Sequence, residues 1–253
     1  MELNRHPLQG VFNIIRFNWH FYLIALLGVL TFIIATLIAP TSFTLRPYLP
    51  YLIVLMITPL VISSLVSFYI YDFSNLYRFS WLPDLDKQSV LNINAGFDET
   101  SEIFKNNYPK IKLAICDFYD PSKHTEISIK RARKKYPPLE GTTSVSTEKL
   151  PFKNGSFDYC LAILSAHEIR DEKERINFFK ELNRVTKKSG KIFVTEHLRD
   201  VNNFMAYTIG FFHFHSTATW IKTFEQSNFH IKKTIVLNPF VKTFVLEKNG
   251  DSL

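Results

Sequence analysis

FYLIALLGVLTFIIATLIA (21–39) and YLPYLIVLMITPLVISSLVSFYIY (48–71) are the stretches that decide how this chain is built. Neither contains a charged residue, and each is long enough as an α-helix to cross ~30 Å of hydrocarbon. The connection PTSFTLRP leaves room only for a tight turn, which predicts an antiparallel transmembrane hairpin with a kink at Pro59. A pair of buried helices in a soluble core is the alternative. A cleaved signal peptide fits less well, because a second apolar run follows at once.

The charges around these runs predict the orientation of the chain. Arg5 and Arg16 precede the first run, Arg78 follows the second, and the connection carries only Arg46. Because basic residues stay inside, we expect a two-pass protein of the inner (cytoplasmic) membrane with both termini and the remaining domain in the cytoplasm. The net charge of +7 suits an anionic leaflet, and KRARKK (130–135) is the densest basic patch, although a solvated helix face explains that patch equally well. No nucleic-acid recognition module accompanies the charge, so nucleic acid is not an expected partner.

Residues 1–83 are therefore predicted to form a membrane anchor with its juxtamembrane linker, and residues 84–253 a separate domain. In that domain strand-like and helix-like segments alternate, which predicts a doubly wound α/β fold with seven strands. The expected strands are 89–94, 112–116, 142–146, 157–164, 191–196, 231–237 and 242–248, and the expected helices are 98–108, 124–136, 171–186 and 216–227.

Turn residues refine this scheme. The Ser189-Gly190 pair is expected to end the third of these helices as a C-terminal cap. Asn238-Pro239 leaves only a short connection, so the last strand should run antiparallel to the others. Cys116 and Cys160 lie in strand-like runs, where we expect two buried, reduced thiols.

Three stretches of this domain resemble the class I S-adenosylmethionine-dependent methyltransferases. They are SVLNINAGFDETSEIF (89–104), EKLPFKNGSFDYCLAILSAHE (148–168) and FFKELNRVTKKSGKIFVTEH (178–197). Their order and spacing make the resemblance more specific than a lone glycine loop, and it extends over residues 89–248. It implies a Rossmann-like fold, a transferase activity and S-adenosylmethionine as the cofactor.

The resemblance also implies where the cofactor lies, which agrees with the rule that ligands bind at the carboxyl edge of such sheets. The turn after the first strand would approach the methionyl part, Asp117 would accept hydrogen bonds from the ribose hydroxyls, and Asp120 is the fallback for that acid. The implied cofactor-binding residues are Asn94, Ala95, Gly96, Asp98, Thr100, Asp117, Ser146, Thr147 and Leu164. The turn departs from the family pattern, since Asn92 replaces an acid and Asn94 and Asp98 replace glycines, and Asp98 could compensate by pairing with the cofactor's ammonium group.

Methyl transfer asks the protein to align two reactants and to remove one proton. The candidate catalytic residues follow the fourth strand or lie in the segment after the fifth: His167, Glu168, His213 and His215. His167 leads as the general base because imidazole titrates near neutral pH. His and Glu residues could instead hold a divalent metal, but no tight ligand spacing supports this, and we expect no metal.

The segment 204–216 is aromatic and apolar, which is unusual for a cytosolic loop. It predicts a hydrophobic lid or a surface that dips into the leaflet, and a core helix is the competing explanation. Together with the hairpin it favours a lipophilic acceptor at the cytoplasmic membrane face: a quinone, a phenolic lipid, a polyene or a phospholipid. The alternatives are a catalytically silent scaffold, suggested by the missing glycines, and other chemistry on a quinone. Membrane lipid is an expected partner, and the hairpin offers a surface for self-association.

Overall fold

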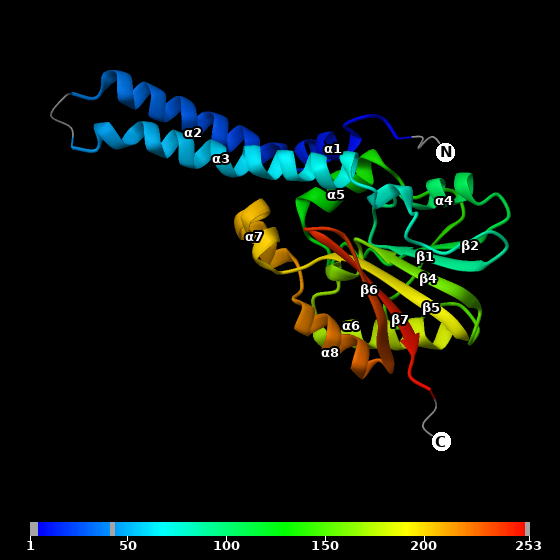
Figure 1. The fold of residues 1–253 in the computed structure, drawn as a ribbon. Coiled ribbons are helices and arrows are strands. Elements are labelled where there is room, and N and C mark those ends of the chain that lie inside the picture. Colours follow the sequence, from blue (N-terminus) through cyan, green and yellow to red (C-terminus); the bar gives the residue numbers. More distant parts are fainter. Residues whose placement is uncertain (1–4, 41–43, 251–253) are drawn as a thin grey trace.

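The computed structural model describes residues 5–40 and 44–250 and shows two long helices projecting from an α/β domain (Figure 1). Helices α2 (Trp19–Ile38) and α3 (Leu49–Phe68) lie side by side and antiparallel, as predicted. Both are long and apolar enough to cross a membrane, and they are hardly buried within the chain, unlike the core helices of a soluble domain. Helix α3 passes through Pro59 without ending and leads into a π-helical turn, η2 (Tyr69–Phe73).

The α/β domain is built on a seven-stranded sheet with the order β3-β2-β1-β4-β5-β7-β6. Its strands are β1 (Ser89–Asn94), β2 (Lys112–Asp117), β3 (Thr142–Ser144), β4 (Phe157–Ile163), β5 (Thr186–His197), β6 (Phe229–Asn238) and β7 (Val241–Lys248). Strands β1 to β5 pair in parallel, whereas β7 pairs antiparallel with both β5 and β6. The seven strands and the antiparallel last strand are confirmed.

Helices and turns connect and cover this sheet. The helices are α1 (Gln9–Phe17), α4 (Ser101–Asn107), α5 (Ile127–Lys135), α6 (Glu172–Val185), α7 (Val201–Tyr207) and α8 (Thr217–Gln226). Short 3-10 turns are η1 (Arg46–Tyr48), η3 (Leu76–Arg78), η4 (Ala166–Glu168) and η5 (Thr208–His213). Alternate strand residues face opposite sides, so Leu161 packs in the core on the α4 side and Cys160 in the core under α6 and α8. Burial raises the pKa of both Cys116 and Cys160 to about 12, and both thiols are free.

The expected helix cap at Gly190 is wrong. Helix α6 ends at Val185, Thr186 already has extended backbone angles, and Gly190 lies inside β5. A Cβ atom on Gly190 would lie 2.8 Å from the carbonyl oxygen of Asp158 and 3.0 Å from that of Phe157. The glycine therefore permits close approach of β5 to β4 at a shift in their register.

The segment before the α/β domain is more tightly joined to it than a linker would be. Helix α1, which the sequence did not predict, contacts α5, and Ile70 and Leu76 are buried in the same core as Phe104 of α4. Asp72 accepts hydrogen bonds from the first turn of α1, from Gly10 N at 2.7 Å and Val11 N at 2.8 Å. The hairpin and the sheet thus share a hydrophobic core and a polar junction.

Candidate functional site

A cavity of about 670 Å³ lies between the carboxyl edge of the sheet and the base of the hairpin. Its sheet side is formed by the ends of β1, β4 and β5 and by residues of α5 and η5. Its other side is formed by α1, α2 and α3, including Phe21, Ala25, Met56, Leu60 and Ser63. The cavity therefore runs from the polar edge of the α/β domain to apolar side chains of the hairpin.

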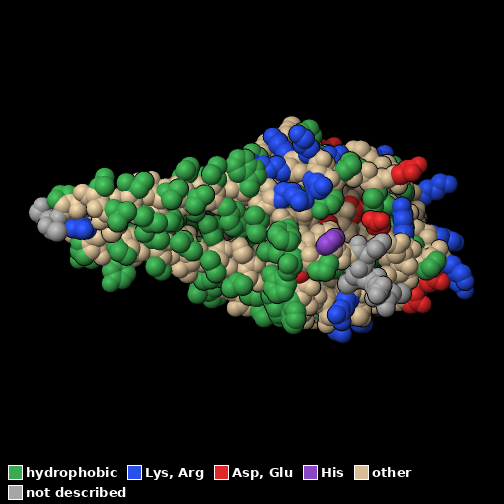
Figure 2. All heavy atoms as spheres, turned by 90° about the horizontal axis from the view of Figure 1, so that it is seen from above, with side chains coloured by type: hydrophobic (Ala, Val, Ile, Leu, Met, Phe, Trp, Pro, Cys, Tyr) green, Lys and Arg blue, Asp and Glu red, His purple; other side chains and the backbone are tan. Residues whose placement is uncertain are grey.

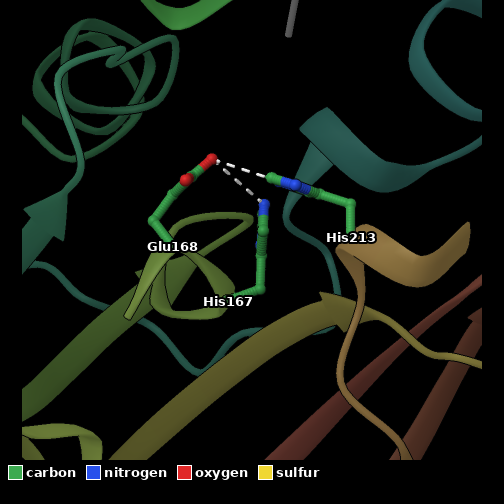
Figure 3. Close-up of side chains that lie close together, drawn as sticks. All are labelled: His167, Glu168 and His213. Atoms are coloured by element: carbon green, nitrogen blue, oxygen red, sulfur yellow. Dashed lines mark hydrogen bonds and ion pairs between the residues drawn. The ribbon is translucent and has the colours of Figure 1, made fainter. Parts of the chain in front are cut away.

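Three of the four predicted catalytic side chains meet at the sheet end of this cavity: His167, Glu168 and His213 (Figure 3). The 3-10 turn after β4 carries His167 and Glu168, and the end of η5 brings His213 over them. Glu168 Oε1 lies 3.6 Å from His167 Nε2 and 3.3 Å from His213 Nε2. The second ring nitrogen of each histidine has its own carboxylate, with Glu196 Oε2 2.5 Å from His167 Nδ1 and Glu126 Oε1 2.8 Å from His213 Nδ1.

The charged groups of this cluster stabilise one another's ionised forms. Burial opposes ionisation of Glu168, but the hydrogen bond from His213 and the charges of His167, His213 and Arg170 outweigh it and lower its pKa to about 2. Burial also opposes the charged form of His213, but its hydrogen bonds to Glu126 and Glu168 raise its pKa to about 9. At neutral pH the cluster thus holds an ionised carboxylate beside a protonated imidazole.

The structure separates His215 from the other three predicted residues. Its ring packs on Trp220, and its Nε2 lies 3.3 Å from the carbonyl oxygen of Ile169 and from Arg175. Burial, followed by the charges of Arg175 and Arg170, lowers its pKa to about 3. His215 is placed to support the fold, beneath the site and away from the cavity lining.

Other polar groups that line the cavity come from positions the sequence gave no reason to connect. His197 Nε2 lies 2.9 Å from the hydroxyl of Tyr71, which belongs to the π-helical turn after α3. Glu99 accepts hydrogen bonds from Arg5, Gln9 and Asn13 through Oε1 and from Tyr77 through Oε2. These contacts join residues that are 22 to 126 positions apart, so no local motif could reveal them.

The predicted cofactor turn has a well-ordered polar framework. Buried Asn92, at the position where the family has an acid, donates to the hydroxyls of Thr100 and Ser101, both at 2.7 Å. Asp98 Oδ1 accepts from Thr100 N and Ser101 N, so α4 begins at Ser101, three residues later than expected. Asp98 Oδ2 is buried and has no hydrogen-bond partner among the described residues.

The predicted ribose acid is already engaged by the protein itself. Asp117 is buried at the end of β2 and forms an ion pair with Arg133 of α5. The Arg133 guanidinium lies 4.7 Å from the ring centre of Tyr119, and a Cβ atom on Gly96 would lie 2.9 Å from that ring. Tyr119 and Arg133 therefore occupy the space between the turn and Asp117.

The remaining predicted cofactor residues fall into two groups. Asn94, Ala95, Thr100 and Leu164 line the large cavity. Strand β3 ends at Ser144, so Ser146 and Thr147 lie in the loop beyond it, where they line a second cavity of about 250 Å³ with Asp120.

Comparison with known proteins was made for the whole chain. A family model described as a methyltransferase domain matches residues 104–194. This segment resembles a methyltransferase domain. The match begins after the irregular turn that follows β1 and includes the second stretch quoted above and the third as far as residue 194. A search of curated protein sequences gave no match.

Solved structures show the same fold. A SAM-dependent methyltransferase from Aquifex aeolicus is 13% identical with a TM-score of 0.50, over 74% of this chain and 97% of that one. A methyltransferase of Haloferax volcanii, solved with the Trm112 methyltransferase activator, is 12% identical with a TM-score of 0.51, over 68% of this chain and 86% of that one. The pyocyanin biosynthetic protein PhzM is 14% identical with a TM-score of 0.50, over 82% of this chain and 59% of that one. The domain match and the shared fold support a SAM-dependent methyltransferase.

The residues present fit S-adenosylmethionine at the methionyl end, where the unpartnered Asp98 Oδ2 can accept from an ammonium group. At the ribose end Asp117 offers the required carboxylate, once Arg133 has moved aside. When bound, the cofactor supplies an activated methyl group on a sulfonium. Asp98 and Asp117 would hold and orient it beside the sheet end of the large cavity, although neither of them, nor Gly96, is among the residues that line that cavity.

Proposed function

We propose that this protein is a membrane-anchored SAM-dependent methyltransferase that acts on a lipophilic small molecule at the cytoplasmic face of the membrane. The observation that carries this proposal is the shared wall of the large cavity. Met56 and Leu60 of the hairpin line the same cavity as His167 and Glu168 of the methyltransferase domain. A polar reacting group can thus lie at the sheet while its apolar body lies along the hairpin.

The outer surface supports this placement. Apolar side chains cover the hairpin, and basic side chains gather where it joins the α/β domain (Figure 2). Arg131 of the basic patch donates to the carbonyl oxygen of Phe17 at 2.7 Å and packs over Trp19, at the start of α2. The exposed Lys130, Lys134 and Lys135 of α5 are close to this junction and can face anionic headgroups.

The segment 204–216 also favours contact with lipid. Met205, Ile209 and Phe212 are exposed, at 64%, 79% and 61%, so the segment is not the core helix that was the competing explanation. Helix α7 packs against α3. Because η5 also lines the cavity, the segment can act as a lid whose outer face enters the leaflet.

Transfer of a labelled methyl group to lipid tests this function. Membranes containing the full-length protein are incubated with S-adenosylmethionine labelled in its methyl group, and the organic extract is analysed by mass spectrometry. Leu60→Trp fills the cavity from the hairpin, whereas Leu65→Trp lies 62% exposed on the outer face of the same helix and serves as the matched control. We expect a labelled lipid with wild type and Leu65→Trp, and a strong loss with Leu60→Trp although S-adenosylhomocysteine still binds.

Label confined to protein or to the aqueous phase would contradict the lipophilic acceptor. The Arg133–Asp117 pair is the observation that favours a second candidate, a catalytically silent scaffold that retains the fold. That candidate gains if the full-length chain shows neither methyl transfer nor calorimetric binding of S-adenosylhomocysteine.

A further inference from the structure

The cluster at the sheet end of the cavity has the composition of a metal site. His167, Glu168 and His213 each offer one ligand atom, and these atoms lie within 4.8 Å of one another. We propose that they form a binding site for one divalent first-row transition-metal ion. Two imidazoles and one carboxylate are the donors that Zn²⁺, Fe²⁺ and Co²⁺ commonly take, with positions left open for other ligands. The ion would displace the proton that His213 carries at neutral pH.

The distances suit one ion. With metal–ligand bonds of about 2.0–2.2 Å, two ligand atoms on a tetrahedral or octahedral ion lie roughly 2.8–3.6 Å apart. Glu168 Oε1 lies 3.6 Å from His167 Nε2 and 3.3 Å from His213 Nε2, so two of the three edges already have these lengths (Figure 3). The third edge, between the two imidazole nitrogens, is at most 4.8 Å and must shorten when an ion binds.

The groups behind the ligands give the second, independent argument. Metal-bound histidines usually donate their other ring N–H to a carboxylate, which fixes the tautomer and aims the free nitrogen at the metal. His167 has this arrangement, since its Nδ1 lies against Glu196. The Nδ1 of His213 lies against Glu126 and also contacts the Arg170 guanidinium, which would have to leave this nitrogen for Glu126 to fix the tautomer. Glu196 has no exposed side-chain surface and also accepts from the backbone N–H of His167 at 3.2 Å, so this partner is firmly held.

The local charge favours a cation at this point. Three carboxylates, from Glu126, Glu168 and Glu196, surround the two imidazoles. The nearest guanidinium is that of Arg170, which contacts His213 Nδ1, donates to the backbone carbonyl of His213 and lies 3.8 Å from Glu126 Oε1. One guanidinium does not balance three carboxylates, and a divalent ion between the two Nε2 atoms would add positive charge beside Glu168.

The site opens toward the acceptor. All three ligand residues line the large cavity, so a position left free on the ion faces the space that continues to the hairpin. A hydroxyl or carbonyl oxygen of the lipophilic acceptor can take that position and be held in place beside the methyl donor. This role of the ion rests on the proposed function, whereas the binding of the ion does not.

Binding is measured on the full-length chain in detergent, freed of any affinity tag and stripped with a chelator, by titration with Co²⁺ and with Zn²⁺. Visible absorption of Co²⁺ reports the ligand field, and calorimetry with Zn²⁺ gives affinity and stoichiometry. We expect one ion per chain with wild type and loss of that binding in Glu168→Gln and His213→Gln. Glu196→Gln should weaken binding about 10–100-fold, as expected for a group behind a ligand.

His230→Gln is the matched control, because His230 is an exposed histidine beside a carboxylate, 3.7 Å from Glu247, and far from the cavity in the fold. It should bind the ion like wild type, and thermal unfolding should show that all variants remain folded. Absence of saturable binding, or equal binding in Glu168→Gln and wild type, overturns the proposal. Because no donor or acceptor is present in the titration, bound metal without methyl transfer would instead count against the proposed function alone.

Discussion

Replacement of Arg133 by Met should tighten cofactor binding. In the structure the Arg133 guanidinium forms an ion pair with the carboxylate of Asp117. The cofactor's ribose hydroxyls would have to donate to the same carboxylate. Arg133→Met removes this competitor and keeps an apolar stem against Tyr119. The buried carboxylate is then left without a cation and gains more from accepting the two hydroxyls.

The size of the effect follows from exposure. A hydrogen bond to a charged group contributes ~1.5–3 kcal/mol when buried. Here the Asp117 side chain is 4% exposed and that of Arg133 31% exposed, so solvent screening reduces the stabilisation by this ion pair to about 1 kcal/mol. Loss of the competing pair should therefore lower the dissociation constant roughly fivefold.

Calorimetric titration of the full-length chain with S-adenosylhomocysteine measures this change. Lys134→Met is the control, because Lys134 is exposed on the same helix and loses the same charge. Asp117→Asn should weaken binding by ~1.5–3 kcal/mol, or about 10–100-fold. Equal affinities for Arg133→Met and Lys134→Met would refute the competition, and weaker binding by Arg133→Met would mean that the guanidinium itself contacts the cofactor.

Three further predictions concern the junction, the pH dependence and the orientation. Asp72→Asn should loosen α1 by ~1–3 kcal/mol, because an amide can no longer accept from both Gly10 N and Val11 N. Hydrogen exchange of residues 9–17 should rise, whereas Asp84→Asn, at an exposed carboxylate, should leave it unchanged. Burial lowers the pKa of His197 to about 4 in the folded protein, so its unfolded form takes up a proton first. The free energy of unfolding should therefore fall as pH drops from about 6.5 toward 4, by ~3 kcal/mol at most. Thermal unfolding of His197→Phe should depend less steeply on pH than that of wild type, and an equally steep dependence would exclude His197 as the cause. A thiol at Leu45→Cys should react with an impermeant reagent added to intact cells and one at Lys153→Cys should not, with little background because Cys116 and Cys160 are buried; labelling of Lys153→Cys would reverse the orientation.

The strands of the domain could be predicted because their signal is local. Apolar residues that recur in runs such as 89–94 and 157–164 are buried on both faces of the sheet, and the observed bounds differ by one residue or none. The predicted Gly190 cap failed because its signal is not local. A glycine after a helix indicates either a left-handed cap or a close backbone approach, and only the position of β4 decides between them.

The candidate site could be predicted only in part. His167 and Glu168 follow a strand whose end lies at the ligand-binding edge of the sheet, so their position at this edge could be predicted from the sequence. His213 and His215 are two positions apart and looked equivalent, yet the turn at η5 aims one at the cavity and packs the other on Trp220. The pairing of Arg133 with Asp117 depends on where α5 lies against the sheet, which no short motif encodes.

The junction between hairpin and domain changes how the anchor should be understood. Deletion of residues 1–71 would be the obvious way to test whether the hairpin only localises the enzyme. It would also remove Ile70, which is fully buried, the Tyr71 hydroxyl that lies 2.9 Å from His197, and the α1 side chains that hold Glu99. One whole wall of the large cavity would be lost with them.

Loss of activity in such a truncation would therefore say little about the membrane. Comparison of Leu60→Trp with Leu65→Trp separates localisation of the enzyme from enclosure of the acceptor, because both variants keep every residue of the junction. A hairpin that merely localised the enzyme would tolerate both substitutions, whereas one that helps to enclose the acceptor tolerates only the second.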